Sequence, residues 1–126
     1  MKARQSWIKW LPDNDDGATA VEFAIVAPVF LALVFGIVQI SLLAFTVASL
    51  NYAVEKAARC NAVRTNCPAP ISFYYAPGAP NFAAPESRSC GVFRSATISY
   101  NLNVLAFQRP IQLSAQACFP DLKTGA

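Results

Sequence analysis

The feature that most constrains this chain is a long uncharged segment near its N-terminus. From Phe23 to Val54 there is no Asp, Glu, Lys or Arg, and most of the residues are apolar. About 20 apolar residues, each adding about 1.5 Å of rise, are enough for a helix to cross the hydrocarbon core of a bilayer. The sequence therefore predicts a helix that is inserted in a membrane at some stage.

An acidic residue, Glu22, opens this apolar segment. A carboxylate is costly in lipid unless it has a partner, so its position indicates a functional contact. The alternative is a side chain that simply reaches the polar interface. Three basic residues precede the segment, Lys2, Arg4 and Lys9. By the positive-inside rule they predict a cytoplasmic N-terminus and an exported C-terminus.

The order of segments at the N-terminus differs from that of an ordinary secretory signal. Such a signal has a short apolar core followed by a small-residue cleavage site, which leaves a soluble mature protein. Here a charged stretch comes first, Gly17 follows it, and the apolar segment begins directly afterwards. Cleavage after Gly17 would leave the apolar helix on the mature protein, as in a prepilin. We therefore expect residues 1–17 to be a cleavable prepilin-type leader.

The residues after Gly17 carry a resemblance to known families. The Gly-x-x-x-x-Glu-Phe pattern that ends at Phe23 resembles the processing site of type IV pilin-like proteins, in particular that of tight-adherence (Tad, Flp-type) pilins. The opening Gly-Ala-x-Ala-Val-Glu-Phe-Ala, Pro28 six residues after Glu22, and Phe-Gly-Ile-x-Gln ending at Gln39 are similar to the signature of TadE/TadG-like pseudopilins. The resemblance covers residues 17 to 60 closely and the rest only in outline.

The resemblance implies a minor pseudopilin with a structural role in assembly, adhesion or secretion by a Tad pilus. Its implied partners are a prepilin peptidase, the major pilin, other pseudopilins, the inner-membrane assembly platform and the lipid bilayer. It implies a single-pass protein of the bacterial inner membrane with a periplasmic C-terminus, which then enters the extracellular pilus. The implied processing residues are Gly17, Ala18, Glu22 and Phe23.

Elementary chemistry gives each motif residue a role. Gly17 allows an extended backbone to enter a peptidase active site. Glu22, once buried among packed helices, would pair with the α-amine that cleavage creates at Ala18 of a neighbouring subunit, because an isolated buried carboxylate is costly. Pro28 removes a helix hydrogen bond and is expected to kink the helix. Gly36 is a second candidate for a kink or a close-packing surface.

The helix is expected to run from 18 to 59 as one element. The alternative, a helical hairpin, is rejected because no turn signal interrupts the segment. Its second half is amphipathic. One face carries Leu43, Val47, Leu50, Val54 and Ala57. Another face carries Asn51, Glu55 and Arg59, and the last two are spaced for an i, i+4 ion pair.

Residues 60–126 are expected to form a small exported domain. All four cysteines lie there, which is typical of an oxidising compartment and two disulfides. Three pairings are possible; Cys60–Cys67 would close a turn after the helix, and we favour Cys90–Cys118 because these residues flank a predicted hairpin. The absence of His and of a CxxC pair argues against a metal site.

Two alternating segments predict the strands of this hairpin, at about 92–104 and 111–118, joined by residues 105–110. The hairpin should be antiparallel and pack its apolar face on the amphipathic half of the helix, which gives an α+β fold. Residues 66–89 contain five prolines and predict an irregular loop. Its aromatic residues either cover a small core or contact another subunit; they are Phe73, Tyr74, Tyr75 and Phe82.

Enzymatic function is not expected, because the chain has no histidine, no Gly-rich phosphate loop and no carboxylate pair outside the acidic leader. No cofactor is expected. A net charge of +3 without a basic block gives no support for nucleic-acid binding. The alternative function is an uncleaved single-pass membrane protein whose periplasmic domain binds an envelope component. The mature N-terminus distinguishes the two hypotheses.

Overall fold

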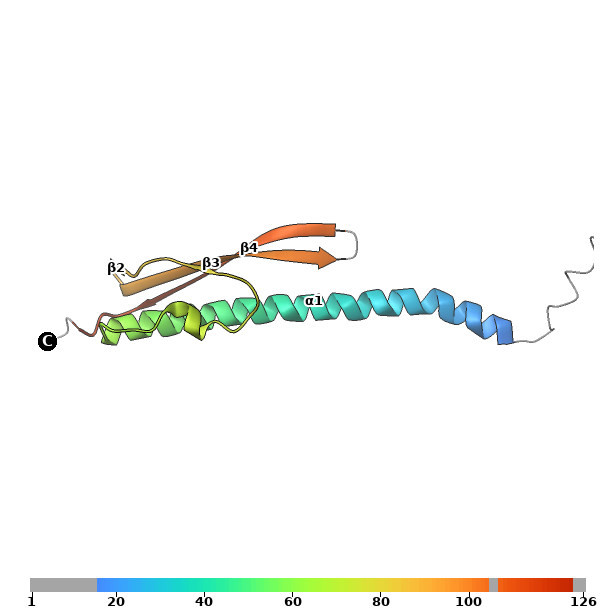
Figure 1. The fold of residues 1–126 in the computed structure, drawn as a ribbon, viewed down its shortest axis with the longest axis horizontal. Coiled ribbons are helices and arrows are strands. Elements are labelled where there is room, and N and C mark those ends of the chain that lie inside the picture. Colours follow the sequence, from blue (N-terminus) through green and yellow to red (C-terminus); the bar gives the residue numbers. More distant parts are fainter. Residues whose placement is uncertain (1–15, 105–106, 124–126) are drawn as a thin grey trace, which may run out of the picture. The chain divides into compact units, whose positions relative to one another are not determined.

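The computed structural model describes residues 16–104 and 107–123 (Figure 1). Its elements are α1 (Asp16–Val63), the 3-10 helix η2 (Pro70–Phe73), and the strands β1 (Asn81–Phe82), β2 (Glu86–Arg88), β3 (Gly91–Val104) and β4 (Phe107–Phe119). The chain divides into two compact units, Met1–Phe35 and Gly36–Ala126. The predicted leader, 1–17, falls almost entirely outside the described residues.

Helix α1 is unbroken over 48 residues and passes through Pro28 without interruption. It extends four residues beyond the expected end at Arg59, to Val63. The backbone N–H of Arg64 donates to the carbonyl of Cys60 at 2.7 Å, which closes the last turn. The Cys60–Cys67 disulfide then links this turn to the loop that follows.

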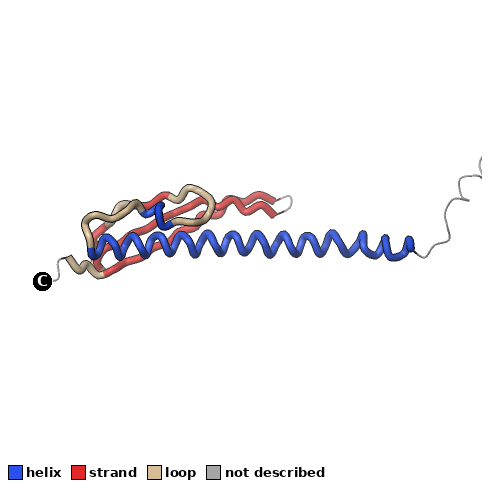
Figure 2. Tube along the Cα trace, turned by 60° about the horizontal axis from the view of Figure 1, so that its bottom comes forward, coloured by secondary structure: helices blue, strands red, loops and turns tan. Residues whose placement is uncertain are grey.

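The second unit contains a four-stranded antiparallel sheet in which β3 is central. Strand β4 pairs with β3 along its whole length, from Val92↔Phe119 to Val104↔Phe107. Strands β1 and β2 pair with different parts of the opposite edge of β3. The α+β fold and the antiparallel hairpin are therefore confirmed, and Figure 2 shows the sheet alongside the helix. The second disulfide joins Cys90 to Cys118 at the hairpin base, the pair that the sequence favoured.

One boundary of the hairpin was predicted wrongly. Residues 107–110 were expected to belong to the connection, but they form the start of β4 and pair with Asn101–Val104. Pro110 within this stretch cannot donate to a sheet ladder. Since β4 lies at an edge of the sheet, a proline is tolerated there.

The core of the second unit lies between the sheet and residues 46–62 of α1. Its central cluster consists of Leu50, Val54, Ala96, Ile98 and Ala115. Around this cluster the helix presents a row of buried alanines, Ala53, Ala57, Ala58 and Ala62.

The buried face of α1 is rotated from the predicted one. Leu50, Val54 and Ala57 are buried as expected, but Val47 is 36% exposed. Thr46 and Ser49 lie in the interface instead. Both hydroxyls have hydrogen-bond partners there. Thr46 Oγ1 donates to the carbonyl of Leu42 at 2.9 Å. Ser49 Oγ accepts hydrogen bonds from the backbone N–H groups of Tyr75 and Ala76.

The predicted ion pair between Glu55 and Arg59 is also absent from the structure. The Arg59 guanidinium instead lies over the Phe119 ring, 5.0 Å from its centroid. This contact competes for the same side chain and joins the end of β4 to α1.

The proline-rich loop contributes to the core with two of its four predicted aromatics. Tyr74 and Phe82 pack against the central cluster, whereas Tyr75 is 68% exposed. The Tyr74 hydroxyl donates to the carbonyl of Pro77 at 3.0 Å. Burial raises the pKa of Tyr74 above its ordinary value of 10.0.

Candidate processing and assembly site

The four predicted processing residues lie in the first turns of α1 and are all exposed: Gly17, Ala18, Glu22 and Phe23. The bond after Gly17 is thus in helical backbone rather than in an extended segment. The first turn of a helix has unpaired N–H groups and opens at little cost in free energy. A peptidase that needs an extended substrate would have to unwind only this turn.

Glu22 shares one face of α1 with Thr19, Phe23 and Val26, and these four residues line a shallow recess. Phe23 is 73% exposed and Val26 is 58% exposed. Within the described residues, Glu22 makes no ion pair. An acidic side chain thus lies at the edge of an apolar surface, where a cationic partner from another molecule could reach it.

The rest of this helix surface is apolar and open. Gly17–Val63 is long and apolar enough to cross a membrane, and its most apolar window has a mean hydropathy of 2.6 with none of the window buried in the chain. Large side chains project around the helix, with Val29 69% and Ile40 67% exposed. A helix that is apolar on all sides requires lipid or other helices around it. The structure thus suggests a single-pass membrane protein.

The two predicted kink residues occupy different surroundings. Pro28 lies inside α1, with its surface exposed, and the kink expected there stays a prediction. A methyl group added at Gly36 would meet nothing within 4 Å. Gly36 therefore does not serve close packing against its own chain, although it could serve packing against a partner.

A buried cation, Arg94, was missed by sequence reasoning. It lies on the helix-facing side of β3 between Val92 and Ala96 and is 8% exposed. Its guanidinium Nη1 donates to the carbonyl of Ala83 at 2.8 Å, which holds the loop after β1 against β3. Burial lowers the pKa of Arg94. Arg94 occupies an alternate position of β3 that it shares with Val92 and Ala96, and this spacing was the sequence signal that could have revealed its burial.

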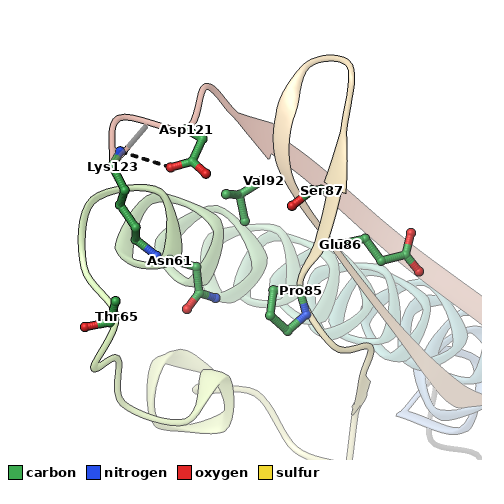
Figure 3. Close-up of a pocket in the computed structure, with 8 residues that line it drawn as sticks. All are labelled: Asn61, Thr65, Pro85, Glu86, Ser87, Val92, Asp121 and Lys123. Atoms are coloured by element: carbon green, nitrogen blue, oxygen red, sulfur yellow. Dashed lines mark hydrogen bonds between the residues drawn. The ribbon is translucent and has the colours of Figure 1, made fainter. Parts of the chain in front are cut away.

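A second recess lies near the end of α1 (Figure 3). Its lining comes from the helix end, the segment around β2, β3 and the C-terminal segment: Asn61, Thr65, Pro85, Glu86, Ser87, Val92, Asp121 and Lys123. The Asp121 carboxylate already accepts the backbone N–H of Lys123 at 3.0 Å. Among the described residues no group of three His, Cys, Asp or Glu side chains could hold a metal ion. Sequence reasoning could not assemble this recess, because its residues come from separate segments.

Comparison with known proteins bears on the N-terminal segment. The model of the TadE-like protein family matches residues 17–59. No curated protein and no solved structure matches the chain. The match includes the predicted processing residues and most of α1, and together with the single apolar helix it fits a pilin-like protein related to Tad pili. Over residues 17–59, the chain is similar to the TadE-like proteins.

Proposed function

We propose that this chain is a minor pseudopilin of a Tad pilus system. A prepilin peptidase cleaves it after Gly17, while α1 holds it in the inner membrane with its N-terminus in the cytoplasm and its C-terminal domain in the periplasm. The observation that carries this proposal is the exposed apolar surface of α1, which opens on Glu22 within a segment that matches the TadE-like family.

Assembly transfers α1 from lipid to the helices of the major pilin and other pseudopilins, through the assembly platform. The apolar surface suits both surroundings, since neither offers water to polar groups. Glu22 is the exception: in a dry helix bundle its carboxylate needs a cation. Cleavage creates one at the α-amine of Ala18. Loss of one partner of a buried pair costs about 3–5 kcal/mol, enough to decide whether a subunit enters the filament.

The chain acts as a substrate of the peptidase and as a structural subunit, and it catalyses nothing itself. Its C-terminal domain, residues 60–123, sets the contacts outside the membrane. Those contacts, rather than α1, determine whether the protein is located at the tip, in the shaft or at the base of the pilus.

The mature N-terminus tests the processing step. Expressed together with its peptidase, the chain should lose residues 1–17, and intact-mass measurement should give Ala18 as the first residue. Gly17→Val should block the cut, because a branched side chain restricts the extended backbone that the enzyme needs. Gly36→Val, a matched change further along the same helix, should leave cleavage intact. Retention of Met1 in the wild-type chain would contradict the proposal.

The role of Glu22 is tested separately from cleavage. Glu22→Ala should still be processed, but its incorporation into isolated filaments should fall at least tenfold, as expected for a loss of more than about 1.4 kcal/mol. Unchanged incorporation would refute the pairing with Ala18. If Met1 is retained, the uncleaved membrane protein with a periplasmic binding domain becomes the better hypothesis, and the recess in Figure 3 is its candidate site.

A further inference from the structure

The β3–β4 hairpin continues well past the core that it forms with α1. The core uses Ile98 and Ala115, yet the paired ladder runs on to Val104↔Phe107. We call residues 100–103 and 107–111 the hairpin end. Strand alternation places five of its residues on the same face of the sheet as Ile98: Tyr100, Leu102, Phe107, Arg109 and Ile111. None of the five belongs to the core cluster; Tyr100, Leu102 and Ile111 are partly buried, whereas Phe107 is 75% exposed.

The position of the hairpin end along the second unit follows from contacts at the other end of β4. Phe119 lies against Arg59, and the backbone N–H of Leu122 donates to the carbonyl of Ala62 at 3.1 Å. From Phe119 back to Phe107 the strand rises about 40 Å, at about 3.3 Å per residue. The same distance corresponds to about 27 residues of helix. The hairpin end therefore reaches the level of about residue 36 of α1.

Burial along α1 agrees with this level. Gln39 and Leu43 are half-buried, although the helix residues between them are exposed. They continue, at spacings of three and four, the face on which Thr46 and Leu50 are buried. In Figures 1 and 2 the hairpin runs alongside the C-terminal part of α1, and the end at which β3 leads into β4 points away from the C-terminal end of the helix.

This level coincides with the expected boundary of the bilayer. Counted along the sequence, a span of about 20 residues that begins at Phe23 ends near Leu42. Residue 36 is about six residues earlier, or about 9 Å along the helix axis. Elements that lie in a membrane interface typically bury their apolar side about 5–10 Å deep. The hairpin end thus reaches the depth of the headgroups and the first acyl carbons.

The chemistry of the hairpin end suits that depth. Phe107, Leu102 and Ile111 are apolar, while Tyr100 combines an aromatic ring with a hydroxyl, as residues at membrane interfaces commonly do. Arg109 is exposed on the same face. From Ser87 to Pro120 the chain contains no Asp or Glu. The surface is therefore complementary to the phosphates of an anionic lipid leaflet.

We propose that the hairpin end is a second membrane contact of this protein. Phe107 and Leu102 enter the lipid interface, and Arg109 binds a lipid phosphate. The contact holds the C-terminal domain in one orientation on the membrane until α1 leaves the lipid. This inference rests on the proposed function in one respect, namely that α1 lies in a bilayer.

The test uses single tryptophans in the full-length chain, reconstituted in phosphatidylcholine–phosphatidylglycerol vesicles. The native tryptophans are replaced by Trp7→Phe and Trp10→Phe. Phe107→Trp then reports on the hairpin end, and Phe93→Trp, at the base of the same hairpin, is the matched control. Phe30→Trp reports on α1. Lipids brominated near the headgroup quench the fluorescence of a tryptophan that touches them.

The expected result is that quenching at position 107 exceeds quenching at position 93 about threefold or more, with strong quenching at position 30 as well. Equal, weak quenching at positions 107 and 93 with strong quenching at position 30 would overturn the second contact and leave the anchor intact. Absence of quenching at all three positions would overturn both proposals. A third outcome is that the emission wavelength of the tryptophan at position 107 shifts with the protein-to-lipid ratio, while the brominated lipids do not quench it. This outcome would assign the surface to a contact with another subunit and refute the lipid contact.

Arg109 supplies an independent arm. Arg109→Gln should reduce the ratio of lipid-engaged to free hairpin ends about fivefold in anionic vesicles, and much less in pure phosphatidylcholine. Arg109→Lys should retain most of the effect, because the charge is kept. Arg88→Gln, at the opposite end of the sheet, is the charge control and should change nothing. An equal effect of Arg109→Gln in both lipids would refute the phosphate contact.

Discussion

Removing the Cys90–Cys118 disulfide should destabilise the C-terminal domain more than removing Cys60–Cys67. The two bridges close loops with sequence separations of 28 and 7 residues. In the loop-entropy description, the longer bridge contributes about 3.6 kcal/mol and the shorter about 2.4 kcal/mol at 25 °C. Their difference, about 1.2 kcal/mol, is independent of the constant term and corresponds to about eightfold in the unfolding equilibrium.

The perturbation is a pair of double substitutions, Cys90→Ser with Cys118→Ser and Cys60→Ser with Cys67→Ser. Each protein is held in detergent micelles, which keep α1 helical, so that urea unfolds only the domain packed on it. Near-ultraviolet circular dichroism of the tyrosines follows the loss of tertiary packing. The slope of the free energy of unfolding against urea must also be compared, because a cross-link alters the surface exposed on unfolding.

Cys60 lies in the last helical turn of α1, so residual helix in the unfolded domain would shorten its effective loop and widen the difference between the two variants. An equal loss for both variants, or a greater loss for Cys60–Cys67, would refute the loop-entropy reasoning. The bridges would then stabilise the domain through local packing.

Three further predictions concern the core, a turn and pH. Leu50→Ala should cost about 2–5 kcal/mol in the urea assay, whereas Val47→Ala, at the half-exposed position that the sequence misassigned, should change stability by less than about 0.5 kcal/mol. Gly91→Ala should prevent correct closure of the hairpin, because φ there is 117° and the added methyl group would collide with the carbonyl at the end of β4. The control Gly36→Ala adds a methyl group that meets no atom within 4 Å, so it should preserve the domain. Because burial raises the pKa of Tyr74 above 10.0, the unfolded chain deprotonates first; this stabilisation is full below about pH 10 and is lost as the pH rises through the folded-state pKa. Tyr74→Phe should therefore flatten the decline of the urea midpoint between about pH 9 and pH 11, and an unchanged decline would contradict the assignment.

Sequence patterns that depend on one element predicted the fold well. The absence of charge from Phe23 to Val54 predicts a long apolar helix, because no charged residue and no turn signal interrupts it. Period-two alternation predicts β3 and most of β4, since only one face of the hairpin is buried. The cysteines at the base of the hairpin were paired correctly once the strands were antiparallel.

Burial and strand pairing that depend on contacts between two segments could not be predicted from the sequence of either segment alone. Thr46 and Ser49 enter the core because local carbonyls and loop N–H groups satisfy their hydroxyls, which a hydrophobic pattern cannot anticipate. The short strands β1 and β2 exist only because β3 offers them an edge. Arg94 is buried because the carbonyl of Ala83 accepts from it. The proposed assembly contact of Glu22 would require a second molecule.

The alanine row on α1 has a consequence for how this domain tolerates change. Ala53 and Ala58 are completely buried, and Ala57 and Ala62 nearly so. Alanine loses no side-chain rotamers on burial, so these four positions are filled at little cost in side-chain entropy. Truncation has almost nothing to remove there, whereas any larger side chain must displace the atoms that cover α1 at that position. In a saturation mutagenesis screen these positions should therefore be sensitive to added volume rather than to lost volume, the reverse of an ordinary leucine-rich core.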